Sequence, residues 1–262
     1  MKKIIIIFAL FFAFANHSFS YWDNASTINT KKMDLRLMSF SEVGIADNYS
    51  IKFHPLAMFV SPSFDLKYSF PNKDLSFFAG INYPTPLLKL VQNKGAGGFI
   101  SPEFSIPQLF SFRIGYEENL NVNERLNFYT NLYFEYAPTS KLDRSMIIDI
   151  PVIAPQMAVY SKGFGINVNV ALQGKAIGKF DYYLKMGANI FPFSTEDIPA
   201  NRKDYMPDQN MNAFVELNPM IIWNLCETFQ LAAGAKVTNG DYLFGNTWNT
   251  WPHIDFRQAI QF

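Results

Sequence analysis

Two histidines beyond the first twenty residues, His54 and His253, are the side chains best suited to acid–base chemistry. His253 and Asp255 stand two positions apart, so on an extended strand they share one face. A base with an orienting carboxylate could serve a hydrolase acting on lipid or peptide at a membrane rim, but a triad also needs a nearby nucleophile. The sequence has no nucleophile-elbow glycine pattern around a serine. We therefore predict a protein that is not an enzyme, with no catalytic residue, and keep the rim hydrolase as an alternative.

Other residues with reactive or ligating chemistry give weak signals. Gly95, Gly97 and Gly98 lack the Lys-Ser/Thr ending of a phosphate-binding loop. Cys226 is the single cysteine, which excludes an intramolecular disulfide and a cysteine-rich zinc site. Two lone histidines do not make a metal site, and no twelve-residue calcium-loop spacing is present. We therefore expect neither a cofactor nor a metal.

Charged residues recur instead at every second position, between apolar ones. One such run is Phe64, Asp65, Leu66, Lys67, Tyr68, Ser69 and Phe70. This period of two places apolar side chains on one face of a β-strand and polar ones on the other. Several runs keep their phase for ten residues or more, whereas soluble strands average about 5–6 residues and membrane strands need about 9–11. Strand length therefore favours a membrane β-barrel.

Twelve segments are predicted to be strands, with ten as the lower count. They are 33–39, 43–54, 58–70, 74–84, 108–117, 125–136, 145–152, 163–173, 178–191, 211–223, 227–237 and 253–262. An even number suits a closed antiparallel barrel whose two ends meet. Lipid offers no hydrogen bonds, so closure is needed to pair every backbone amide. The predicted fold is a closed, antiparallel transmembrane β-barrel.

Residues 1–20 have the pattern of a cleavable signal peptide. Lys2 and Lys3 precede an unbroken apolar run over 4–15, and Ser18 and Ser20 are small residues before a cut at Tyr21. The run is shorter than the roughly 20 residues that a membrane helix needs. We expect residues 21–262 to form the barrel. The 22 basic and 22 acidic residues balance, which gives no electrostatic footprint for nucleic acid.

The polar phase of the strands predicts the lumen lining. Its positive members are Lys52, Lys67, Arg113, Arg125, Lys185, Lys236 and Arg257, and its negative members are Asp65, Glu117, Glu135, Asp181, Glu216 and Asp255. These charges either pair for stability or line an ion-conducting pore, and their near-balance then predicts weak charge selectivity. Aromatic residues at strand ends are predicted to form girdles at the lipid–water boundary, namely Tyr83, Tyr116, Tyr136, Phe180, Trp223 and Phe229.

The last residues alternate as Ile254, Phe256, Gln258, Ile260 and Phe262. This resembles the C-terminal strand of bacterial outer-membrane β-barrel proteins, a porin-like class, although Gln258 departs from an all-apolar phase. The resemblance implies an outer-membrane location, contact with outer-membrane lipid, and recognition of Phe262 by the barrel-assembly machinery. It also implies periplasmic termini, short periplasmic turns at 174–177 and 224–226, and outer loops at 191–210 and 238–252. It does not fix the oligomeric state.

Residues 85–107 do not fit this scheme, because the predicted strand count puts the long connection on the periplasmic side. Either one strand upstream is miscounted, or the segment packs as a partial plug in the lumen. We expect a passive channel for small solutes or a structural surface protein. A secreted β-sandwich that binds glycans is a further alternative.

Overall fold

The described part of the chain forms one closed sheet. A computed structural model describes residues 22–56, 58, 62–71, 73–82, 110–123, 125–137, 163–190, 213–242 and 245–262. Within these ranges twelve antiparallel strands form a closed barrel, in which each strand pairs with its neighbours in sequence and β1 pairs with β12. The predicted closed antiparallel barrel of about twelve strands is confirmed, and the β-sandwich alternative is wrong because there is no second sheet among the described strands.

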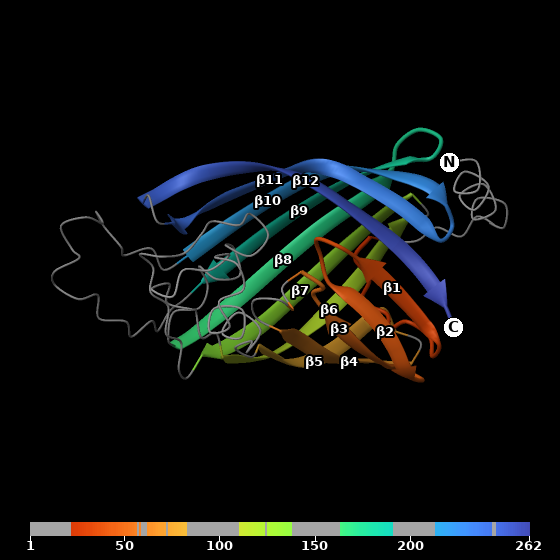
Figure 1. Ribbon diagram of the computed structural model, residues 1–262, viewed down its shortest axis with the longest axis horizontal. Helices are drawn as coiled ribbons and strands as arrows, with labels where there is room; N and C mark the ends of the chain where they lie inside the picture. Colours follow the sequence, from red (N-terminus) through yellow and green to blue (C-terminus); the bar gives the residue numbers. More distant parts are fainter. Residues whose placement is uncertain are drawn as a thin grey trace, which may run out of the picture.

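The strands differ greatly in length. Their bounds are β1 Lys32–Arg36, β2 Ser41–Ala46, β3 Tyr49–Phe53, β4 Ser63–Ser69, β5 Leu75–Asn82, β6 Ser111–Asn123, β7 Leu126–Ala137, β8 Gly163–Lys175, β9 Phe180–Ile190, β10 Ala213–Cys226, β11 Phe229–Tyr242 and β12 Gly245–Gln261. Figure 1 shows the short strands β1 to β5 along one side of the barrel and the long strands β8 to β12 along the other. The seam closes from Lys32 opposite Gln261 to Arg36 opposite Arg257.

Strand order fixes which connections share an end of the barrel. The end where β1 begins and β12 stops carries only connections of two to five residues, between β2 and β3, β4 and β5, β6 and β7, β8 and β9, and β10 and β11. We call this the terminal end. The opposite end carries the connections over 83–110, 138–162 and 191–212. The short turns predicted for the terminal end are therefore present, while the opposite end also carries short connections, between β1 and β2 and between β11 and β12.

The predicted side of 85–107 is wrong. The segment 43–54, predicted as one strand, is the hairpin of β2 and β3 with a turn at Asp47 and Asn48. The extra strand reverses the direction of β4 to β7 relative to the prediction, so β5 ends and β6 begins at the end opposite the termini. Residues 85–107 and the predicted strand at 145–152 lie outside the described residues. The described strands number twelve, as predicted, with β2 and β3 in place of the single segment 43–54.

The last hairpin also differs from the prediction. Residues 238–252, expected as an outer loop, are mostly strand, since β11 and β12 pair from Phe229 opposite Gln258 to Tyr242 opposite Gly245. The turns predicted at 174–177 and 224–226 lie at 176–179 and 227–228. The loop predicted at 191–210 lies outside the described residues, between the end of β9 and the start of β10.

The distribution of polar and apolar side chains is the inverse of that in a water-soluble protein. Ile114 and Ile254 are each more than 60% exposed on the outer surface, while Lys67 and Glu117 are fully buried inside the barrel. An outward apolar surface around a polar interior is the arrangement that a hydrocarbon environment requires. No helix in the described ranges is long and apolar enough to span a bilayer.

Aromatic rings pair across strands near both ends of the outer surface. Tyr136 stacks on Phe164 with ring centroids 4.6 Å apart at the end opposite the termini. Phe180 stacks on Trp223 at 5.9 Å near the terminal end. Two further pairs, Phe229 with Phe256 and Tyr116 with Phe77, lie at 6.1 and 6.4 Å, and the predicted girdle residue Tyr83 lies outside the described residues. Amphipathic rings at these positions suit the two lipid–water boundaries.

Candidate functional site

A cavity of about 250 Å³ occupies the barrel interior, and its walls come from nearly every strand. Its lining is rich in charge. The cationic members are Arg36, Lys52, Arg113, Lys185, Lys236 and Arg257, and the anionic members are Asp23, Asp34, Glu42, Asp65, Glu117, Glu135 and Glu216. Six positive and seven negative groups nearly cancel, so the cavity has many strong hydrogen-bonding groups and little net charge.

One cluster of these charges bridges β4, β5, β6 and β7. Arg113 donates through Nη1 to Asn82 Oδ1 at 2.8 Å, through Nε to the Asp65 carboxylate, and through Nη2 to the Ser63 hydroxyl. Asn82 in turn donates to Glu135 at 3.2 Å. The register places Asp65, Gly80, Arg113 and Glu135 in one row across the four strands. Charged hydrogen bonds of this kind are short and strong, and here they fix the side chains against the wall.

Gly80 makes room for that cluster. It lies between Asp65 and Arg113 in the row, and a Cβ at this position would overlap the Asp65 carboxylate. The absence of a side chain therefore allows the carboxylate and the guanidinium to meet across the intervening strand.

A second cluster centres on Lys67, which is completely buried. Its ammonium lies 3.3 Å from Glu42 Oε2 and 3.1 Å from Glu117 Oε2. Lys52 forms a further ion pair with Glu117. Buried ions are stable only when paired and hydrogen-bonded, because transfer out of water is costly. The inner surface of β2, β3, β4 and β6 is therefore a closed network with its charges already neutralised.

The wall opposite this network carries amides. Inward-facing asparagines succeed one another on β7 to β10, namely Asn131, Asn167, Asn169, Asn189 and Asn218. Asn169 donates to Asn131 at 3.3 Å, and Asn131 donates to Glu117 at 3.1 Å. The remaining amides have atoms without a partner. The lumen thus has a charge-paired half on β1 to β6 and an amide half on β7 to β10.

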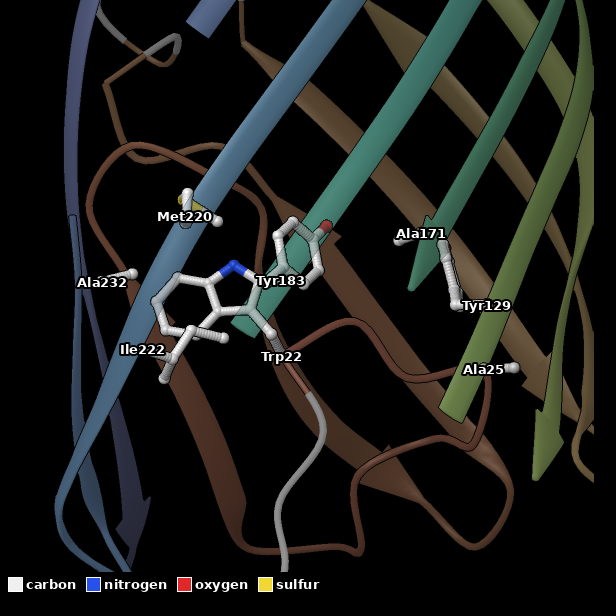
Figure 2. Close-up of a cluster of buried hydrophobic side chains, with 8 residues drawn as sticks. All are labelled: Trp22, Ala25, Tyr129, Ala171, Tyr183, Met220, Ile222 and Ala232. Atoms are coloured by element: carbon white, nitrogen blue, oxygen red, sulfur yellow. The ribbon is translucent and has the colours of Figure 1, made fainter. Parts of the chain in front are cut away.

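We call residues 22–31, which precede β1, the N-terminal segment. Residues 22–28 lie inside the barrel at the terminal end, and residues 29–31 are exposed. Figure 2 shows the Trp22 indole inside the lumen beside Tyr183 on β9 and Met220 and Ile222 on β10. Trp22 is 2% exposed, and its backbone N–H donates to Gln173 on β8. The Arg36 guanidinium lies 5.4 Å from the centre of the indole ring. Met220 and Ile222 are apolar residues on a mostly polar inner face, and they belong to the same buried cluster as this indole.

Polar contacts tie the N-terminal segment to the opposite wall as well. Lys67 donates to the carbonyl oxygens of Asn24, at 2.8 Å, and Ser26, at 3.3 Å, while Ser69 donates to that of Ala25 at 3.2 Å. Asn119 on β6 donates to the Asn24 side chain at 2.6 Å. These contacts reach strands on opposite sides of the barrel, so the segment crosses the lumen and obstructs its terminal end.

Asp23 is the charged anchor of the N-terminal segment. It lies 3.3 Å from Arg36 and accepts a hydrogen bond from the Tyr183 hydroxyl. Burial alone would raise the pKa of this carboxyl, but the fields of Lys185 and Arg36 together outweigh burial and the pKa is lowered. The ionised form is therefore the one that holds the segment in place.

The structure places the predicted lumen residues in three groups. Lining the cavity are Lys52, Asp65, Arg113, Glu117, Glu135, Lys185, Glu216, Lys236 and Arg257. Lys67, Asp181 and Asp255 are buried inside the barrel, where they bind other protein groups. Arg125, expected on the lumen face, lies in the turn between β6 and β7 and is exposed, because the strand begins one residue later. Phe262, the predicted assembly signal, is exposed after the end of β12.

Four charged residues of the cavity were not predicted. Asp34 and Arg36 alternate with apolar residues in β1, and Arg257 and Arg36 both bind Asp34, at 2.7 and 3.0 Å. This alternation could have shown that both side chains face the lumen. Glu42 lies before the predicted start at 43, and placing the strand boundary two residues late omitted it. Asp23 lies in no strand, and no period could have placed it in the lumen.

The histidines show no catalytic arrangement among the described residues. Asp255 accepts from the backbone N–H groups of Leu37 and Met38, at 3.0 and 2.9 Å, and from the Ser39 hydroxyl, so it ties down the β1–β2 connection. His253 faces the cavity, but no hydrogen bond joins it to Asp255. His54 Nε2 lies 3.1 Å from the Met38 carbonyl oxygen. The described ranges hold no group of three or more residues placed to bind a metal ion.

No protein-family model matches this chain, and no curated protein matches it. Among solved structures the chain is similar to a bacterial polysaccharide outer membrane secretin, with a TM-score of 0.44 and 10% identity over 87% of this chain and 69% of that one. It is similar to the NanC porin, with a TM-score of 0.45 and 8% identity over 88% and 97%. It is also similar to OprB of Pseudomonas putida, with a TM-score of 0.36 and 8% identity over 84% and 72%. At such low similarity, what those proteins carry or bind says nothing about this chain.

Proposed function

We propose that this protein is a channel of the bacterial outer membrane for small polar solutes, with a lumen narrowed at the terminal end by the N-terminal segment. The observation that carries the proposal is a polar cavity lined by thirteen charged groups inside a closed barrel whose outer surface is apolar. Side chains fill the interior of an eight-stranded barrel. Twelve strands give an interior that is wider than this and narrower than that of a sixteen-stranded porin.

The charge balance supports a channel of weak ionic preference. Six cationic and seven anionic groups line the cavity, and most are paired with each other. A strong field of one sign would favour ions of the opposite sign, and this lining has none. Small uncharged and singly charged polar solutes are therefore better candidates than multiply charged ones.

Single-channel recording in planar bilayers tests the proposal. Purified protein is expected to give stepwise currents of small amplitude, and a salt gradient should give a reversal potential close to zero. The matched variant is Trp22→Ala, which loosens the obstruction and should increase the amplitude. Absence of steps from the unmodified protein, at any voltage, would refute the channel.

A purely structural barrel is the second candidate, and the N-terminal segment favours it. The segment contacts β4 and β6 on one side and β8 and β9 on the other. A permanently obstructed lumen would serve shape or surface display alone. The recording separates the two, because a structural barrel conducts only after the segment has been removed.

A further inference from the structure

The amide half of the lumen has buried polar atoms that the protein does not satisfy. The Nδ2 atom of Asn167 and the Oδ1 atoms of Asn189 and Asn218 have no hydrogen-bond partner. All three side chains are more than nine-tenths buried, and all three line the cavity. Buried amides normally find partners, and those that do not point to a missing one. On this wall, donors and acceptors face the cavity without a protein partner.

Lys185 is the second unusual feature of this wall. Each of the other five cations that line the cavity has a carboxylate oxygen within 4.0 Å, whereas Lys185 has none among the described residues. The charge of Lys185 acts on two carboxylates, those of Asp23 and Glu216, and both already bind other groups. Asp23 binds Arg36 and Tyr183, and Glu216 lies 2.9 Å from Lys236. Within the described part of the chain, Lys185 is thus the cation of the cavity that lacks a direct counter-ion.

Gly187 makes room for the Asn169 amide two positions along β9 from Lys185. It is the next inward position after Lys185 on β9 and pairs with Asn169 on β8 and Glu216 on β10. A Cβ at Gly187 would lie 2.6 Å from Asn169 Oδ1, so any side chain here would intrude on the amide. Asn218 stands directly across from Lys185 on β10. The lysine, two amides and the glycine that makes room for one of them therefore share one patch of the cavity wall.

We propose that this patch binds a small organic acid whose carboxylate pairs with Lys185 and whose hydroxyl groups bond to the amides of Asn169, Asn189 and Asn218. The inference rests on the proposed function, since a solute must reach the lumen to bind. A carboxylate supplies the missing counter-ion, and hydroxyls both donate and accept, which matches amides. The cavity of 250 Å³ equals the volume of about eight waters, enough for a molecule the size of a six-carbon sugar acid.

Direct binding of gluconate and glucose to the purified protein in detergent, measured by calorimetry, tests the proposal. The two probes are similar in size and hydroxyl content, and only gluconate carries a carboxylate. Gluconate is expected to bind about 10- to 100-fold more tightly than glucose, the range of one hydrogen bond to a charged group. Lys185→Gln should remove that preference. The matched control Lys179→Gln changes an exposed lysine in the β8–β9 turn and should leave it intact.

The outcomes separate this inference from the channel proposal. Equal binding of the two probes, or no binding of gluconate, would overturn the inference and leave single-channel currents untouched. Lys185-dependent gluconate binding by a protein that gives no currents would uphold the site and refute the channel. Lys185→Gln could fail to fold, which the loss of heat-dependent gel mobility would show. The comparison of gluconate with glucose on the unmodified protein then still tests the predicted preference for the carboxylate. Asn218→Ala should then weaken both probes.

Discussion

Trp22 anchors the N-terminal segment in the lumen, and Trp22→Ala is expected to release it. The indole is 2% exposed and packs against Tyr183, Met220 and Ile222. Truncation of a buried tryptophan to alanine costs about 3–5 kcal/mol. Since about 1.4 kcal/mol corresponds to a tenfold change in an equilibrium, the released population should rise by at least about 100-fold.

Cysteine labelling measures that population. Ala25 is completely buried in the N-terminal segment, and the native Cys226 is replaced by serine, so Ala25→Cys reports release through its reaction with a maleimide. Local opening exposes the thiol without unfolding the barrel, and the labelling rate follows the open fraction. Trp22→Ala should therefore raise the rate about 100-fold or more.

The control is Trp248→Ala, which truncates an outward-facing tryptophan that is 64% exposed on β12. It should leave the labelling rate at Ala25→Cys unchanged. A rate already equal to that of a free thiol in the parent protein, or a rate that Trp22→Ala does not alter, would refute the placement of the segment in the lumen.

Three further predictions concern the lipid face, a close approach and pH. Ile114→Lys, on the outer face of β6 between Phe112 and Tyr116, should destabilise the barrel by about 2–4 kcal/mol, and Val122→Lys, near the end of the same strand, by about 0–1, in urea unfolding from lipid vesicles. Gly80→Ala should cost about 1–3 kcal/mol in the same assay by displacing Asp65, and an unchanged stability would contradict the close approach. Asp23→Asn should speed hydrogen exchange of residues 22–31 at neutral pH. The unmodified protein should show that increase only as pH falls below 3.8, because a lowered carboxyl pKa keeps the stabilising charge down to that value.

The alternation of apolar and polar residues predicted most of the strands and which side chains face the lumen. It could do so because the lipid outside favours apolar side chains and the lumen favours polar ones at neighbouring positions. It failed at β2 and β3 for a geometric reason. Val43 pairs with Ile51 and Glu42 pairs with Lys52, so odd positions face outward on both sides of the turn. The phase continues through the hairpin without a break. The local signal was Asp47-Asn48, where Asn48 adopts a left-handed backbone with φ of 63°.

The N-terminal segment could not be placed from the sequence because it belongs to no strand. However, the sequence does contain a signal for the site in the barrel where this segment binds. Met220, Ile221 and Ile222 form a continuous apolar run in β10, which indicates a strand covered on both faces. The inner cover is Trp22. The lumen charges on well-phased strands were predictable, whereas their pairing, which depends on register between strands, was not.

The central claim is that apolar side chains on alternate positions contact lipid while those between them face an enclosed polar interior. Spin labels placed one at a time from 128 to 135 on β7 test it, through collision with oxygen, which concentrates in the bilayer, and with a water-soluble nickel complex. Labels at even positions such as 132 and 134 should collide with oxygen, and those at odd positions such as 131 and 133 should not. Even positions shielded from oxygen and nickel alike would place these side chains in a protein core and contradict the account.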